Sequence, residues 1–188
     1  MIPSIDELKN AIKDAMRNAV KDLFEINEDF YYLVLATTGE ARHPYLCACS
    51  YEGLEQTVKK YVDDYGYDYT PQLKADLKWS SADSPYAYFR WDEYFKGKDV
   101  ETLFYKRPHI DDLTMDEWLE EYELRISAMV AALKELDEED VFQRKGIRKH
   151  MLINVAPNHL NIDETAFLLN NPEALKQALA DNALEKDG

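Results

Sequence analysis

The chain has 188 residues, 46% of them hydrophobic, and a formal net charge of −15 at pH 7. This fits one globular domain over residues 1–188, with 185–188 expected to be a frayed tail. The negative charge argues against nucleic-acid or anionic-membrane binding, and no run approaches the ~18 apolar residues of a membrane span. The charged N-terminus does not resemble a signal peptide, and Cys47 and Cys49 are too close for an ordinary disulfide, so we expect a cytoplasmic protein.

The first part of the chain predicts a helix followed by a two-stranded hairpin. Ser4 and Glu7 have the spacing of a capping box, and the apolar stripe after them predicts a helix over 4–25. Residues 30–38, FYYLVLATT, are rich in aromatic and β-branched side chains, which favours a central strand buried on both faces. Residues 44–50 follow a turn and predict its antiparallel partner.

The middle of the chain has weaker patterns. Ser50 is a good N-cap for a helix that runs to about residue 65, and Gly66 is well placed to end it. The inward side of this helix would consist of Leu54, Val58, Tyr61, Val62 and Tyr65. Residues 73–79 alternate weakly and predict a third strand, whereas the aromatic residues of 86–108 fit either a short helix or a loop.

The longest predicted helix covers residues 114–136, TMDEWLEEYELRISAMVAALKEL. Thr114 and Glu117 form a second capping box at its start. Apolar residues then recur at three- and four-residue steps, which places them on one core-facing side. These residues are Met115, Trp118, Leu119, Tyr122, Ile126, Met129, Val130, Leu133 and Leu136.

The last part of the chain predicts a strand over 149–155 beside the first strand, then short helices over 163–170 and 172–184. Helices outnumber strands, and the strands do not alternate regularly with helices, so we expect an α+β fold. It would contain a small, mainly antiparallel sheet packed with an N-terminal helix and a long central acidic helix.

Acidic residues gather at both ends of the long helix. Asp116 and Glu117 complement the helix dipole at its N-terminus, so a structural role is sufficient to explain them. Residues 137–140, DEED, lie near the C-terminus of the helix, where negative charge is unfavourable. They are better evidence of a selected acidic surface, with a solvated turn as the alternative. A basic patch follows, formed by Arg144, Lys145, Arg148 and Lys149.

Tyrosine is unusually frequent, with 13 residues, and Tyr67 and Tyr69 flank Asp68 in a predicted turn. Tyrosine offers a large contact area with little loss of entropy, and carboxylates beside aromatic rings suit recognition of Arg and Lys. We therefore expect a partner-binding surface from this turn and the first turns of the long helix. Its residues are Tyr67, Asp68, Tyr69, Asp116, Glu117, Glu120, Glu121 and Glu123.

No motif indicates catalysis, a cofactor or a metal. The chain contains no P-loop, no G-x-G-x-x-G and no G-x-S-x-G nucleophile elbow. His43 could join Cys47 and Cys49 at a metal, but a closed zinc site needs about four ligands, so we favour buried thiols. His109 near Asp111 could act as a base, although an incidental surface histidine is the favoured interpretation. We expect no catalytic residue, cofactor or metal.

Three short motifs resemble those of an uncharacterised bacterial family of small acidic α+β proteins that is classed as a domain of unknown function. The matching residues are Phe30, Tyr31, Leu35 and Thr37, then Trp79, Ser80, Ala82 and Asp83, then Leu136, Asp137 and Phe142. The chain departs from the family at Ser81 and Ser84, where proline and an aromatic residue are commoner. Families of this kind resemble immunity proteins of bacterial toxin systems. The resemblance implies no activity and no catalytic residue. We expect Asp83 to cap or brace a turn rather than to take part in catalysis.

These observations favour a non-enzymatic, acidic, cytosolic binding protein with a basic protein partner, such as an immunity protein that neutralises a basic toxin domain. We expect no nucleic-acid or membrane partner. One alternative is a small hydrolase-like enzyme whose His, Asp and Tyr side chains converge from separate loops; a His–carboxylate pair in a deep pocket would favour it. Another is a homo-oligomeric housekeeping protein whose acidity serves solubility; an exposed apolar patch and a concentration-dependent mass would favour it.

Overall fold

A three-stranded sheet forms the centre of the computed structural model, which describes residues 1–144, 146–157 and 164–186. In order across the sheet, the strands are β2 (Tyr45–Ser50), β1 (Phe30–Thr37) and β3 (Leu152–Pro157). β1 is antiparallel to β2 and parallel to β3. The α+β prediction is confirmed, but the sheet is mixed rather than mainly antiparallel. β3 follows a long helical crossover, and such a connection returns the chain in the direction of β1.

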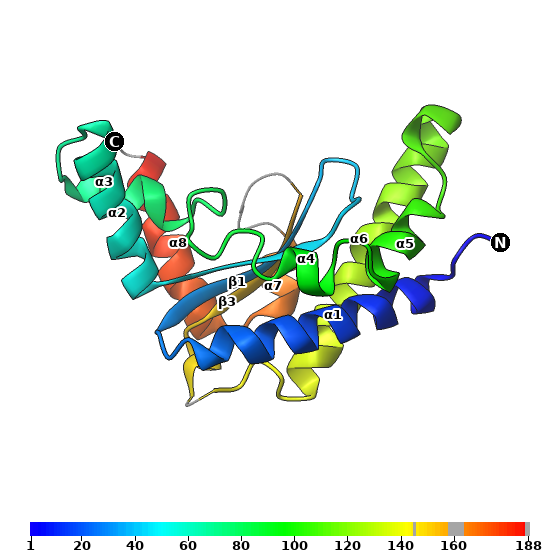
Figure 1. Ribbon diagram of the computed structural model, residues 1–188, viewed down its shortest axis with the longest axis horizontal. Helices are drawn as coiled ribbons and strands as arrows, with labels where there is room; N and C mark the ends of the chain where they lie inside the picture. Colours follow the sequence, from blue (N-terminus) through cyan, green and yellow to red (C-terminus); the bar gives the residue numbers. More distant parts are fainter. Residues whose placement is uncertain (145, 158–163, 187–188) are drawn as a thin grey trace.

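Helices cover both faces of the sheet (Figure 1). They are α1 (Ile5–Glu25), α2 (Tyr51–Tyr65), α3 (Pro71–Lys78), α4 (Trp91–Tyr94), α5 (Asp99–Tyr105), α6 (Met115–Glu138), α7 (Glu164–Leu169) and α8 (Pro172–Lys186), with 3-10 turns η1 (Ile110–Asp112) and η2 (Ile147–Lys149). Leu33 and Leu35 of β1 pack in a core with α1 and α6, whereas Tyr32 and Val34 pack in a second core with α2, α3 and α8. All eight residues of β1 are buried, as expected for a central strand.

The predicted helix starts and stops are confirmed where they depend on local chemistry. Both capping boxes are present, with Ser4 and Thr114 each accepting a backbone N–H three residues later. Gly66 ends α2 in the left-handed conformation, with φ of 74°, which a residue without a Cβ adopts at little cost. α1, β1, β2 and α2 accordingly begin and end within a residue or two of their predicted bounds.

The third strand predicted over 73–79 is wrong, because this segment forms α3. Thr70 caps the helix by accepting the N–H of Leu73 at 3.0 Å, and Pro71 occupies its first turn. Leu73 and Leu77, four residues apart, are its buried residues. The weak alternation was therefore one side of a short helix seen over too few residues.

The undecided segment 86–108 contains α4 and α5, joined and flanked by turns. The predicted strand 149–155 begins later, at Leu152, because η2 precedes it. Lys145 of the basic patch, residue 163 of the predicted helix and residues 187–188 of the expected tail lie outside the described residues. Within the described part of the chain, no helix is both long enough and apolar enough to cross a membrane.

Candidate functional site

The first turns of α6 extend beyond the layered core at one end of the long axis of the molecule (Figure 1). We refer to residues 114–124 as the projecting end of α6. Met115 and Leu119 in this segment are 70% and 44% exposed, whereas Met129 and Leu133 farther along the helix are fully buried. The prediction that the whole apolar stripe faces the core is therefore wrong for its first turns, which form an exposed apolar face.

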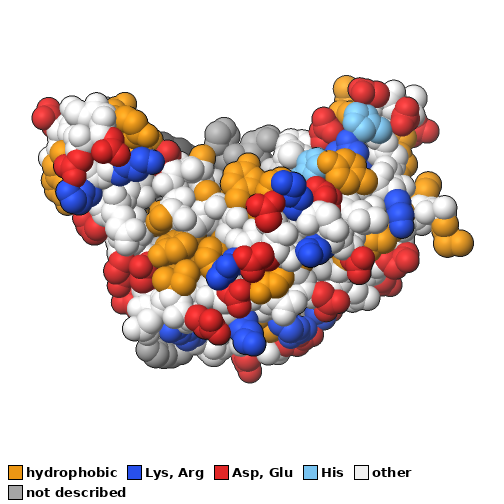
Figure 2. All heavy atoms as spheres, viewed as in Figure 1, with side chains coloured by type: hydrophobic (Ala, Val, Ile, Leu, Met, Phe, Trp, Pro, Cys, Tyr) orange, Lys and Arg blue, Asp and Glu red, His pale blue; other side chains and the backbone are white. Residues whose placement is uncertain are grey.

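Exposed carboxylates border this apolar face. Asp116, Glu120 and Glu123 are exposed, and none of them forms an ion pair with another residue that the structure describes. The half-buried rings of Trp118 and Tyr122 lie against each other, with centres 5.7 Å apart. In the space-filling view, acidic side chains gather around this end of the molecule (Figure 2). Three of the predicted contact residues are thus together on the outer surface of one helix.

Two other predicted contact residues hold the helix in place. Glu117 accepts the backbone N–H of Thr114 at 2.9 Å, and these capping hydrogen bonds lower the pKa of its carboxyl. Glu121 is buried, with its side chain only 9% exposed, and lies between the guanidinium groups of Arg107 and Arg125. Its assignment to a partner-binding surface is wrong, because both carboxylate oxygens are already occupied inside the protein.

The Arg107–Glu121–Arg125 cluster ties the projecting end of α6 to the rest of the fold. Arg107 donates to Glu121 at 2.6 and 2.5 Å, and Arg125 donates to it at 2.6 Å. Burial by itself raises the pKa of the Glu121 carboxyl, but the hydrogen bonds from both arginines outweigh that effect, so the pKa is lowered. The arginines also donate to the backbone carbonyls of Pro3, Glu40 and Pro108. The i, i+4 spacing of Glu121 and Arg125 was the sequence signal for this pairing.

The second acidic cluster, near the C-terminus of α6, is partly neutralised within the protein, together with Glu135 on the same helix. The pairs are Glu135 with Lys9 and Lys13, Glu139 with Lys13 and Arg17, and Asp137 with Arg148. Lys9, Lys13 and Arg17 recur at four-residue steps along α1, so they form a basic row that faces these acids. The interpretation of residues 137–140 as a selected acidic surface is therefore wrong for Asp137 and Glu139.

The tyrosine turn between α2 and α3 lies at the other end of the long axis from the projecting end of α6 (Figure 1). Tyr67 and Tyr69 are 53% and 62% exposed, and Asp68 is exposed. Tyr65 is also exposed, so its predicted place on the inward side of α2 is wrong. The two parts of the predicted contact surface are separate, and the structure does not bring them together.

The W-S-x-A-D segment folds into a turn that packs closely on α2. Asp83 accepts hydrogen bonds from the hydroxyl of Ser80 at 2.5 Å and the phenol of Tyr61 at 2.7 Å, so the Asp83 side chain braces the turn as expected. A Cβ on Gly53 would lie 3.0 Å from Cγ of Pro85, which shows why a glycine allows this close approach. An open pocket of about 430 Å³ remains between the turn and α2.

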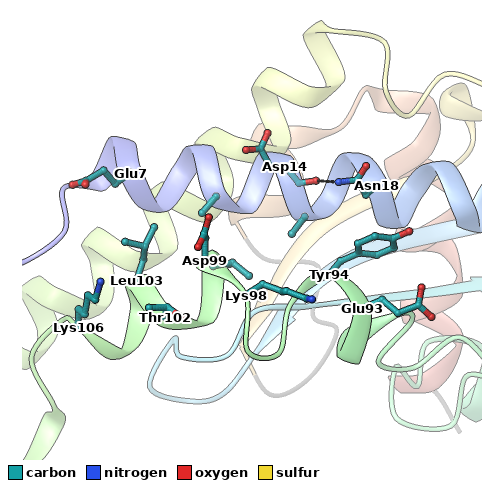
Figure 3. A pocket seen from close by; sticks show the side chains of 13 residues that line it. Glu7, Asp14, Asn18, Glu93, Tyr94, Lys98, Asp99, Thr102, Leu103 and Lys106 are labelled. Atoms are coloured by element: carbon teal, nitrogen blue, oxygen red, sulfur yellow. Dashed lines mark hydrogen bonds between the residues drawn. The ribbon is translucent and has the colours of Figure 1, made fainter.

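A groove of about 520 Å³ separates α1 from α4 and α5 (Figure 3). Its walls are polar, with Glu7, Asp14 and Asn18 from α1 on one side and Lys98, Asp99 and Lys106 on the other. Several of its groups already have partners in the protein. Glu7 belongs to the first capping box, and the hydroxyl of Tyr94 donates to Asp22 at 2.7 Å. Of the other charged lining residues, Asp14, Lys98, Asp99 and Lys106 are of mixed sign and form no ion pair with another described residue.

One histidine lies close to both a carboxylate and a phenol. Nε2 of His43 is 3.1 Å from the hydroxyl of Tyr105, and its Nδ1 is 3.6 Å from a carboxylate oxygen of Glu101. The second distance is too long for a hydrogen bond, and Tyr105 is half exposed. His43 thus contacts α5 rather than the two cysteines.

The cysteines are free thiols buried in the central sheet. Burial raises the pKa of Cys47 to about 11 and also raises that of Cys49, which keeps both thiols protonated at neutral pH. No group of three or more His, Cys, Asp or Glu residues in the described ranges is placed to hold a metal ion.

Comparison with known proteins gives a family but no described function. No curated protein and no solved structure matches the chain. One family model matches residues 12–171, which include β1, α2, the W-S-x-A-D turn and α6. Its description assigns no activity, so it does not bear on the immunity-protein interpretation. The match covers most of the chain and shows that it belongs to the family described as Domain of unknown function (DUF4303).

Proposed function

We propose that this protein is a non-enzymatic cytoplasmic binding protein that docks on a basic protein partner through the projecting end of α6. A basic toxin domain that the protein neutralises would be such a partner. One observation carries the proposal: an apolar helix face remains exposed past the core, and it is bordered by carboxylates that form no ion pair with any residue the structure describes.

The apolar residues would supply most of the affinity. Burying an exposed side chain such as Met115 or Leu119 in a partner contributes up to about 1.5–3 kcal/mol, less for the part of Leu119 that is already covered. Trp118 and Tyr122 lie beside them and are of the residue types that are enriched at interaction hot spots. The Arg107–Glu121–Arg125 cluster already holds this part of α6 in place, so the helix loses little conformational freedom on binding.

The carboxylates would orient the partner and raise the association rate. Asp116, Glu120 and Glu123 add to the negative field of a chain with a net charge of −15, which attracts a basic surface before contact. Such steering raises association rates toward about 10⁸–10⁹ M⁻¹s⁻¹ at low salt and weakens as salt is added. Replacing these carboxylates with lysine would remove the attraction to a basic surface and leave the apolar face unchanged.

The test combines partner capture with association kinetics. Protein captured from the native cell on the immobilised chain is identified, purified and measured against wild type and two double variants across a salt series. Glu120→Lys with Glu123→Lys reverses the border of the apolar face. Glu25→Lys with Glu138→Lys makes the same change in net charge away from the projecting end of α6, at exposed positions that form no ion pair within the described part of the chain.

We expect the first pair to slow association at low salt by more than about tenfold and to flatten its salt dependence, and the second pair to have a much smaller effect. Equal effects of the two pairs would remove the projecting end of α6 from the contact. Leu119→Ser should raise the dissociation rate. If the wild-type chain instead forms dimers that Leu119→Ser dissociates, the apolar face serves self-association and the proposal is wrong.

A further inference from the structure

The pocket between α2 and the W-S-x-A-D turn contains a carboxylate whose charge is not neutralised. Asp83 is half-buried and has no Lys, Arg or His of the described chain within ion-pair distance. The hydroxyls of Ser80 and Tyr61 donate to its two oxygens, which fixes the carboxylate in position. Hydroxyl donors orient a carboxylate but do not cancel its charge, and a carboxylate has about four acceptor sites, so further donors can bind.

Aromatic rings form one side of the same pocket. The Tyr61 ring contacts Tyr65 edge-on at 5.2 Å between centres and Tyr67 at 5.4 Å. Donation to the Asp83 carboxylate raises the pKa of Tyr61 to about 12, so its phenol stays protonated and continues to orient Asp83. Tyr65 is exposed, and its ring has the Lys60 ammonium 5.9 Å from its centre. This ring therefore already lies beside a cation of the protein itself.

We propose that this pocket binds the guanidinium of an arginine side chain presented by a polypeptide. A guanidinium is planar, so it pairs with a carboxylate through parallel hydrogen bonds while its flat face stacks on an aromatic ring. The lysine ammonium has neither feature, so the guanidinium is the stronger ligand and would displace Lys60 from the face of the Tyr65 ring. The volume of about 430 Å³ and the open mouth suit one side chain that enters from solvent.

The remaining lining residues are compatible with this ligand. Among the described residues that line the pocket, Lys60 on the exposed side of α2 is the only positively charged one, and Gln56 and Thr57 are uncharged. Asp63 and Asp64 are exposed on the same helix, and Asp63 pairs with Lys59. The pocket lies at the opposite end of the molecule from the projecting end of α6, so this proposal does not rest on the proposed function (Figure 1).

The test is an NMR titration of the whole chain, observed at the tyrosine rings and backbone amides. The probes are N-acetyl-arginine amide, N-acetyl-lysine amide and N-acetyl-citrulline amide, which has the shape of arginine without its charge, and a short peptide with a single arginine. We expect saturable shifts at Tyr61, Tyr65 and the 80–85 turn with the arginine amide, weaker binding of the lysine amide, and none of the citrulline amide. The peptide should bind more tightly than the arginine amide.

Asp83→Asn should weaken arginine binding by about tenfold or more, because a charge-assisted pair is lost. Asp68→Asn is the matched control, since it makes the same charge change at an exposed position and should bind as wild type does. If Asp83→Asn loosens the turn, Tyr65→Leu removes an exposed ring that is not hydrogen-bonded and should still weaken binding severalfold. Equal binding of arginine and citrulline, or unchanged binding in both variants, would overturn the proposal. If the peptide binds no more tightly than the arginine amide, the proposal that the arginine belongs to a polypeptide is wrong.

Discussion

Replacement of the buried residue Glu121 by Gln should destabilise the protein strongly. The carboxylate accepts three hydrogen bonds from guanidinium groups at 2.5–2.6 Å, and its side chain is only 9% exposed. The uncharged amide keeps one acceptor atom and turns an NH₂ group toward donors. Two buried guanidinium groups then lose their counter-charge, which costs about 3–5 kcal/mol. This is a large fraction of the roughly 5–15 kcal/mol that stabilises most domains.

Urea unfolding followed by circular dichroism measures the loss. With a slope of about 2 kcal/mol per molar urea, the midpoint of Glu121→Gln should fall by roughly 1.5–2.5 M. Glu120→Gln is the matched control, because Glu120 is one residue away but exposed and pairs with no charged group among the described residues. Its stability should change by no more than about 0.5 kcal/mol. A loss below about 1 kcal/mol in Glu121→Gln would refute a buried, charge-dependent support for α6.

The pH dependence separates charge from packing. The folded-state pKa of Glu121 is lowered, so its contribution is present above the ordinary glutamate pKa and is lost as the pH falls through the folded value. The difference in stability between wild type and Glu121→Gln should therefore shrink on acidification. A difference that stays constant from neutral to acidic pH would assign the effect to packing instead.

Two further predictions follow from the packing of α1, α6 and the sheet. Hydrogen bonds from Lys13 and Lys9 lower the pKa of Glu135 to about 2, so the stability that these pairs give is present above the ordinary value of 4.5 and is lost as the pH falls toward 2. Glu135→Gln should flatten the acidic part of the plot of urea midpoint against pH. Glu138→Gln should leave this plot as in wild type, because Glu138 is exposed and forms no ion pair in the described ranges. Cys47 and Cys49 should react with thiol reagents at pH 8 only at the rate at which the protein opens, because both thiols are buried and protonated. Rapid labelling of either thiol in the folded protein would contradict their placement in the sheet.

The sequence by itself determined the elements that are specified by near neighbours. A capping box needs only residues three apart, and a left-handed helix end needs only a glycine, so the bounds of α1, α2 and the start of α6 could be predicted. The run of aromatic and β-branched residues in β1 likewise indicated burial on both faces. α3 was missed although Thr70 and Pro71 carried the signal for a helix start, because a short segment shows too little of its period.

The tertiary structure decided what each acidic residue does. Glu120, Glu121 and Glu135 are chemically alike and lie on one helix, yet one faces solvent, one lies between two arginines and one pairs with lysines of α1. Asp83 and Tyr61, more than 20 residues apart, form their contact only because the turn folds back on α2. Helical spacing predicts which side chains share a face, but the packing of distant elements determines which face is covered and which charges are neutralised.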